Sequence, residues 1–298
     1  MRYIKYCTIL IGAICIFIAL YGCAQSGMHP EIAKSGTSFS ANINIDDSLK
    51  IETPDNAKYI YELGVDIEKS KSQIERCLNV SLADYDNDSL IDDYISYTIG
   101  DWTADIMTEN GYWTIGYLGN KCGEADDISD EDAVKIAAGY LKEHALIGDD
   151  VKMCDAIGLN EGLRDDGSYG VLSKEPYFYP KINEMTVLGI FRIGVTVNTD
   201  GKVVGVDYLV SPVVDKIPAV LADRPAIEAE IAAHNYSASF SQNLSDIKIT
   251  AANYRLYADG KAVDDGKTYL YPVLVLLGQG KTADGNIENF DVIIDAQK

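Results

Sequence analysis

The residues best placed to do chemistry are four carboxylates crowded into one short stretch of the chain. Asp84, Asp86, Asp88 and Asp92 stand at the first, third, fifth and ninth positions of a run that begins at Asp84. Leu90 occupies the seventh position, where its backbone carbonyl can supply one more oxygen. Ca²⁺ prefers hard oxygen ligands of this kind. The spacing therefore predicts a calcium site at these five residues, and Ca²⁺ is the one cofactor that the sequence suggests.

The same run resembles the Asp-x-Asp-x-Asp-Gly-x-x-Asp loops of extracellular calcium-binding repeats. It departs from that pattern at Ser89, which stands where a glycine normally makes the sharp turn. Ile95 also stands where a full EF-hand has its bidentate glutamate. The alternative interpretation is a solvated acidic turn between a helix and a strand.

Residues that could serve an enzyme are few. The only histidines are His29, His144 and His234, and the chain has no HExxH, Gly-x-Ser-x-Gly or P-loop motif. Ser245 and Lys248 match Ser-x-x-Lys without its companion motifs, so a turn that leads into a strand is the simpler interpretation. A hydrolase would need a pocket with convergent titratable groups. We therefore expect a protein without enzymatic activity.

Tyrosines offer a further possibility. Six of the twenty tyrosines can line a carbohydrate or peptide groove, or can simply form half-buried sheet faces. They are Tyr94, Tyr97, Tyr112, Tyr117, Tyr177 and Tyr179.

The N-terminus has the features of an export signal. Arg2 and Lys5 precede an apolar run from Thr8 to Leu20, which is shorter than the 20 or so residues of a membrane span. The sequence that ends this run, Leu20-Tyr-Gly-Cys23, resembles the lipobox of bacterial lipoproteins. The resemblance implies a signal peptide over residues 1–22 and a diacylated Cys23 that anchors the chain in the bilayer, facing the extracytoplasmic side of the cell membrane. The alternative is an ordinary secretory signal or an uncleaved anchor, in which Cys23 is incidental.

Composition limits the partners of the mature chain. The formal net charge is −21, whereas nucleic-acid binding requires clustered Lys and Arg, so we expect no nucleic-acid partner. After the predicted cleavage and lipidation, Cys77, Cys122 and Cys154 are left with no CxxC spacing, so neither a zinc site nor a redox motif is predicted. Two alternatives remain equally open for these three cysteines: one disulfide with one free thiol, or three buried thiols.

Local patterns predict three helices and several strands. The helices are expected over residues 66–78, from 129 to a stop at Gly148, and from Asp223, with Ser129 as the start of a capping box and Pro225 in a first turn. Alternating apolar residues predict the strands. These cover residues 59–63, 94–99, 112–118, 185–197, 203–210, 247–257, 269–277 and 290–294.

The order of these elements predicts an α+β fold of tandem units, each a helix packed on an antiparallel sheet. Residues 23–56 are interpreted as the lipidated cysteine and a flexible tether, with an edge strand near residues 39–45 as the alternative. The remaining chain is divided into an N-terminal α+β region (57–128), a helix-plus-hairpin unit (129–215) and a second helix-plus-sheet unit (216–298).

Three segments carry a broader resemblance. They are Ser129-Asp-Glu-Asp-Ala-Val-Lys-Ile-Ala, Asp200-Gly-Lys-Val-Val and Tyr269-Leu-Tyr-Pro-Val-Leu-Val-Leu. Their arrangement resembles that of the YycH/YycI regulatory proteins and PepSY-like lipoproteins of Gram-positive bacteria. The resemblance implies extracytoplasmic domains that bind another protein, such as a sensor kinase or a secreted protease. Those regulators generally use a transmembrane helix where this chain has a lipobox.

The expected function is therefore that of a membrane-anchored module that binds an unidentified membrane or surface protein. A calcium-dependent cell-surface module is the alternative.

Overall fold

The computed structural model describes residues 29–32, 43–89, 92–119, 123, 127–148, 151–164, 167–240, 243–261 and 266–298. These residues form an α+β fold, as the sequence predicts. The described helices are the 3₁₀ turns η1 (Asp55–Lys58) and η2 (Leu82–Asp84) and the α-helices α2 (Ile67–Leu78), α3 (Asp130–Glu143) and α4 (Arg224–Ala232). The strands are β1 (Tyr59–Leu63), β2 (Tyr94–Ile99), β3 (Trp102–Met107), β4 (Trp113–Tyr117), β5 (Val151–Leu163), β6 (Tyr169–Ile182), β7 (Met185–Gly189), β8 (Ile193–Asn198), β9 (Val203–Tyr208), β10 (Val213–Pro218), β11 (Ser237–Ala238), β12 (Ser245–Ala258), β13 (Thr268–Lys281) and β14 (Ile287–Asp295).

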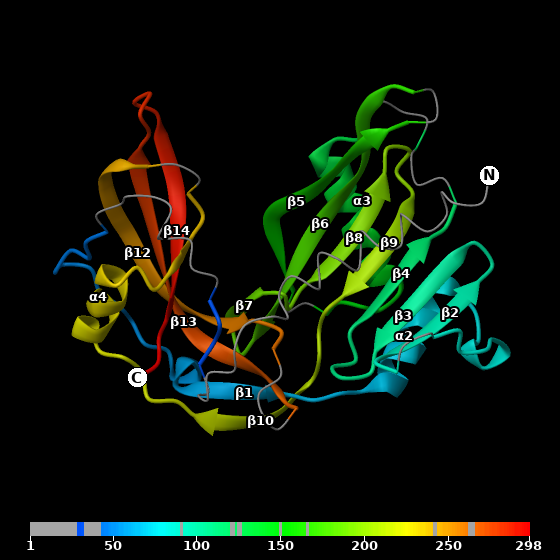
Figure 1. Cartoon of the computed structure of the whole chain (residues 1–298), viewed down its shortest axis with the longest axis horizontal. Coiled ribbons are helices and arrows are strands. Elements are labelled where there is room, and N and C mark those ends of the chain that lie inside the picture. Colours follow the sequence, from blue (N-terminus) through cyan, green and yellow to red (C-terminus); the bar gives the residue numbers. More distant parts are fainter. Residues whose placement is uncertain are drawn as a thin grey trace.

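The strands form two lobes that share one continuous path of pairing. The first lobe has the order β6-β8-β9-β4-β3-β2, with β5 on the outer side of β6. The second lobe has β10-β1-β13-β12-β7, with β14 beside β13 and β11 beside β14. The short hairpin between β6 and β7 joins the lobes, and β1, β10 and the start of β13 form the base between them (Figure 1).

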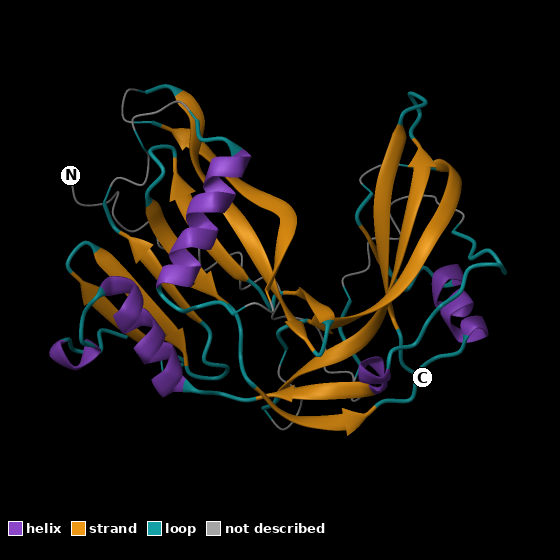
Figure 2. Ribbon diagram, turned by 180° about the vertical axis from the view of Figure 1, so that it is seen from behind, coloured by secondary structure: helices purple, strands orange, loops and turns teal. Residues whose placement is uncertain are grey.

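Helices cover only one face of each sheet. In the first lobe, α2 and α3 lie side by side on the same face (Figure 2), where Ile74 and Leu141 are fully buried in the same core as Val195 of the sheet. In the second lobe, α4 packs through Ile227 and Ile231. Each lobe therefore presents one sheet face without a helix.

Two main hydrophobic cores follow this division. The first contains residues from α2 through β9, so the predicted segments 57–128 and 129–215 share one core and one sheet. Strand β1 instead pairs with β13 and belongs to the second core. The domain boundaries of the sequence analysis thus stay a prediction.

The predicted tether includes residues that are packed in the structure. Ile43 and Ile45 are buried in the second core, and no strand is formed at the described residues 43–45. Further towards the N-terminus, His29 Nδ1 lies 2.7 Å from Asp295 Oδ2, the Glu31 amide donates to Asp259, and Lys261 pairs with Glu31. Residues 29–32 are therefore fastened to the second lobe.

Helix starts agree with the sequence, and one helix end does not. Asp66, Ser129 and Asp223 each cap the first turn by accepting a backbone N–H. Helix α3 ends at Glu143 rather than near Gly148, because Ala145 takes a left-handed φ of 51° and the Leu146 amide turns back to the Leu141 carbonyl.

The Ser129 cap gives a local stability prediction. Its hydroxyl accepts the Asp132 amide at 3.1 Å. Ser129→Ala is expected to lower the free energy of unfolding by about 1 kcal/mol, because that amide loses its partner at the helix start. Urea titration would measure the change, and Ser129→Asp, which keeps an acceptor, should stay near the parent protein. An alanine variant as stable as the parent would show that the cap is dispensable.

The predicted long strand over residues 185–197 is wrong, since it is broken into β7 and β8. Gly189 has a φ of 87°, and a Cβ there would overlap the carbonyl oxygen of Ala258. The chain leaves the sheet at this point, so β7 pairs in parallel with β12 while β8 pairs with β6 and β9.

Candidate functional site

The predicted calcium residues do not form a metal site in the described part of the chain. Asp84, Asp86, Asp88 and Asp92 are all exposed, and Leu90 lies outside the described residues. No three His, Cys, Asp or Glu side chains among the described residues come close enough together to hold a metal ion. Calcium binding by this run stays a prediction.

Within the loop, hydrogen bonds are made by Asn87, which stands between the predicted calcium ligands and is not one of them. The Asn87 Oδ1 accepts the amides of Ser89 at 3.0 Å and Ser96 at 3.1 Å, and the Asp88 amide donates to the Ser96 carbonyl at 2.8 Å. The loop is thus fastened to strand β2, which supports the alternative interpretation of an acidic turn.

Candidate catalytic residues are scattered. His29 contacts Asp295, and His144 Nδ1 lies 2.9 Å from the Arg76 carbonyl oxygen on a different surface. The Ser245 hydroxyl donates to the Lys281 carbonyl at 3.3 Å. Among the described residues, none of these groups forms a nucleophile–base pair.

The six tyrosines of the predicted groove do not share one face either. Tyr97 lies in the first core and Tyr112 is also buried, whereas Tyr94 and Tyr177 alternate to the helix-free face of the sheet.

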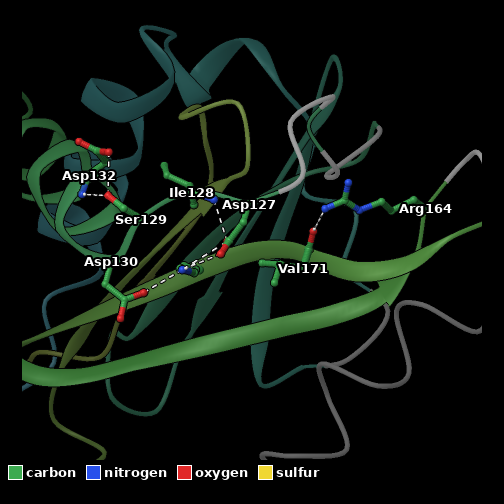
Figure 3. A network of polar contacts seen from close by, with 8 residues as sticks. Asp127, Ile128, Ser129, Asp130, Asp132, Arg164 and Val171 are labelled. Carbon is green, nitrogen blue, oxygen red and sulfur yellow. Dashed lines mark hydrogen bonds and ion pairs between the residues drawn. The ribbon is translucent and has the colours of Figure 1, made fainter.

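The β5–β6 hairpin is anchored near its middle by a buried cation. Lys174 of β6 has a side chain that is only 10% exposed, and its Nζ lies 2.8 Å from Asp130 and 3.3 Å from Asp127 at the start of α3 (Figure 3). The hydrogen bond to Asp130 raises the pKa of Lys174, so the ammonium stays charged. The start of α3 is thereby fixed against the middle of β6.

From the level of this anchor to its tip, the hairpin carries apolar side chains in solvent. Leu159 is 52% exposed, Leu163 73% and Tyr169 70%. Leu163 pairs directly with Tyr169, and Leu159 pairs with Lys174. Because side chains alternate along β5, Leu159 and Leu163 lie on the same face of the hairpin as Lys174. On this face Lys174 contacts the start of α3, whereas Leu159, Leu163 and Tyr169 are exposed. We call Leu159, Leu163 and Tyr169 the hairpin patch.

The outer edge of the hairpin is also free of a neighbouring strand in the described structure. Strand β5 pairs only with β6, and its register shifts after Met153 and after Asn160. Such irregularities discourage the addition of a further strand. The side chains of the hairpin patch, rather than the strand edge, are therefore the more suitable contact surface.

Sequence reasoning missed this hairpin entirely. One signal was present: Asp166-Gly167 is a turn dipeptide, and it stands between two segments that contain strand-forming residues. Gly158 and Gly162 interrupt the alternation of β5, which hides the strand.

A pair of acidic side chains lies on the opposite, helix-free face of the first lobe. Glu175 shares a hydrogen bond with Asp207, and burial followed by the Asp207 charge raises the pKa of Glu175 to about 7. The Tyr177 hydroxyl donates to Glu175 at 3.1 Å, and the Arg192 guanidinium lies 4.4 Å from the centre of the Tyr177 ring. The carboxyl sits over Gly194, where a Cβ would collide with it.

Among the described residues, no cysteine side chain forms a disulfide or part of a metal site. Cys77 is a free, half-buried thiol, and burial raises its pKa to about 11. Cys23 and Cys122 lie outside the described residues, as does the side chain of Cys154.

Comparison with known proteins gives little help with function. No protein-family model matches the chain, and no curated protein matches it. Among solved structures, an uncharacterized protein from Eubacterium rectale is similar with 9% identity, covering 86% of this chain and 90% of that chain, at a TM-score of 0.38. The Bacillus megaterium YpeB C-terminal domain is similar with 14% identity, covering 76% and 97%, at a TM-score of 0.37. Both scores are below 0.5, so the function has to be argued from the residues of this chain.

Proposed function

We propose that this chain is an exported lipoprotein that acts without catalysis, by binding a protein partner through the hairpin patch. The single observation that carries the proposal is the placement of Leu159, Leu163 and Tyr169 on one uncovered face of an anchored hairpin. Contact surfaces between proteins centre on apolar and aromatic side chains held in place before binding. The Lys174 anchor provides that rigidity near the middle of the hairpin.

The membrane-anchored part of the proposal rests on Leu20-Tyr-Gly-Cys23, which lies outside the described residues. In the described part of the chain, no helix has both the length and the apolar character needed to cross a bilayer. His29, six residues after Cys23, is already fastened to the second lobe. Six residues reach about 20 Å at most, so a lipid on Cys23 would hold the second lobe close to the membrane.

Removing the cysteine tests this anchor. Cys23→Ser is expected to move the protein from the membrane fraction to the soluble fraction, because the two acyl chains are lost. Cell fractionation and labelling with radioactive palmitate would measure the change. Cys77→Ser is the matched control and should stay at the membrane. A Cys23→Ser protein that still sediments with membranes would overturn lipid anchoring.

The resemblance to the YycH/YycI and PepSY-like proteins directs the choice of partner. We infer a sensor kinase or a secreted protease as the partner class, reached on the extracytoplasmic side of the membrane. A lipoprotein lacks the transmembrane helix through which such regulators contact a kinase inside the bilayer, so any control would pass through the folded lobes.

Partner binding is tested by chemical cross-linking in intact cells, followed by purification of the tagged full-length protein and mass spectrometry. We expect one membrane or surface protein to be enriched, and the double variant Leu163→Ser/Tyr169→Ser to lose most of it because the apolar contact is gone. Leu118→Ser is the matched control, since Leu118 is 53% exposed at another site. Equal recovery from the double variant and the parent protein would exclude the hairpin patch.

A further inference from the structure

A groove lies on the helix-free face of the second lobe, remote from the hairpin patch. Its volume is about 580 Å³, within the range of small-molecule and short-peptide sites. Strands β7, β12, β13 and β14 all contribute side chains to it. Its lining includes Thr186, Leu188, Asn253, Arg255, Leu277 and Asn289.

Arg255 is the distinctive member of this lining. Its side chain is half-buried, and its guanidinium donates one hydrogen bond to the Tyr254 carbonyl at 3.0 Å. The side chain forms no ion pair in the described structure, although the chain carries a net charge of −21. Burial, with no acidic neighbour to oppose it, lowers the pKa of Arg255. A desolvated cation without a counter-ion is costly, and an anionic ligand would offset that cost.

Asp291, which also lines the groove, and Asp295 lie on the same face as Arg255, and the strand register separates both from it. Arg255 pairs with Val273, which pairs in turn with Asp295, so two strand spacings of about 5 Å separate them. Asp295 is engaged by His29 at 2.7 Å. Asp291 pairs with Leu277, four residues further along β13, or roughly 13 Å from the level of Arg255. Among the described residues, no carboxylate is therefore paired with Arg255.

The rest of the lining selects the kind of anion. Asn253, Asn289 and Thr186 carry groups that both donate and accept hydrogen bonds, as the N–H and C=O of a peptide require. Leu188 and Leu277 provide apolar surface for a side chain. One guanidinium matches a single carboxylate in a two-bond arrangement, and the negative charge of the chain disfavours a multiply charged phosphate.

We propose that this groove binds a short peptide by a carboxylate held on Arg255. The carboxylate comes either from the C-terminus of the peptide or from an Asp or Glu side chain. This site is independent of the hairpin patch, so either proposal can fail without the other.

The test uses the full chain, purified in detergent and labelled with ¹⁵N-arginine. The NMR signal of the Arg255 Nε–Hε group, assigned by its loss in Arg255→Lys, is followed while peptides are added. The probes are three pools of acetylated tetrapeptides: one without Asp or Glu and with a free C-terminal carboxylate, the same pool amidated, and an amidated pool that contains Glu. Binding of each pool is also measured by calorimetry for Arg255→Gln and for Lys248→Gln, which removes the same charge from an exposed position on β12.

Movement of the Arg255 signal by the free-acid pool alone would assign a C-terminal carboxylate, and movement by the Glu pool would assign a side chain. In either case Arg255→Gln should bind about 10-fold more weakly or worse, while Lys248→Gln should bind normally. The proposal is overturned if no carboxylate pool moves the signal, if Arg255→Gln binds as tightly as the parent, or if inorganic phosphate moves the signal and the peptides do not. Thermal unfolding of each variant confirms that a loss of binding is not a loss of folding.

Discussion

Trp113→Ala is expected to lower the free energy of unfolding by about 4 kcal/mol, because it truncates the largest fully buried side chain of the first core. Trp113 is 1% exposed, and its ring stacks on Tyr208 with centroids 5.2 Å apart. Its indole N–H donates to Gln73 Oε1 at 3.0 Å, which ties helix α2 to the sheet. Alanine leaves both a cavity and a buried amide without its partner.

Chemical denaturation of the purified full-length chain measures the loss. The matched control is Trp102→Ala on the neighbouring strand, because Trp102 is the only other tryptophan and is merely half-buried. We expect Trp102→Ala to cost less than half as much. Equal losses at the two positions would show that the buried link between α2 and the sheet is not what stabilises the first lobe.

The second large effect concerns pH and the acidic pair on the helix-free face. The pKa of Glu175 is about 7 in the folded protein and 4.5 as its ordinary value. The folded state therefore holds the Glu175 proton more tightly than the unfolded state, so the stability that Glu175 contributes is fully present below about pH 4.5 and is lost as the pH rises to about 7. One pKa unit is worth about 1.4 kcal/mol, and partial exposure reduces the total, so we expect a fall of about 2 kcal/mol over this window.

Glu175→Gln is expected to remove this fall, because glutamine resembles the protonated carboxyl and can donate to Asp207. Unfolding titrations at pH 5 and pH 8 should show the variant to be about as stable as the parent at the lower pH and about 2 kcal/mol more stable at the higher. Glu161→Gln is an exposed control on β5 and should follow the parent. If Glu175→Gln loses stability between the two pH values as the parent does, then Glu175 is not the group that titrates.

Local sequence was sufficient for features with local causes. The helix starts at Asp66, Ser129 and Asp223 were predictable because a side-chain oxygen and the first turn lie within four residues of each other. The hairpin between β8 and β9 was predictable from Asp200-Gly201, and Gly201 has the φ of 76° that such a turn requires.

Non-local pairing is where sequence patterns failed. The split between β7 and β8 depends on the approach of Ala258 to Gly189, residues far apart in the chain. Likewise, β1 belongs to the second lobe because of its pairing with β13, which no local periodicity encodes. Strand β3 was missed although Trp102-Thr-Ala-Asp-Ile-Met alternates, because it follows β2 after only a two-residue turn.

The candidate sites show the same limit. The spacing of the four aspartates in the acidic run predicted that they bind one metal ion, yet all four are exposed to solvent in the described loop. The hairpin patch and Arg255 are candidate sites because, in the described structure, the patch side chains are exposed and no carboxylate pairs with Arg255. The hairpin extends past the start of α3, where Leu163 is exposed, and in the described structure neither Asp291 nor Asp295 pairs with Arg255. Neither condition can be read from one stretch of sequence.

Photo-cross-linking from single positions in intact cells would show whether the hairpin patch contacts a partner at the membrane. A photoreactive amino acid is placed at position 163 of the full-length protein and, in a parallel strain, at position 118. We expect one discrete cross-linked product from position 163, absent from position 118, and lost when Cys23 is replaced so that the protein leaves the membrane. Identical products from both positions, or none from position 163 while the protein is folded and membrane-bound, would contradict partner binding through the hairpin patch.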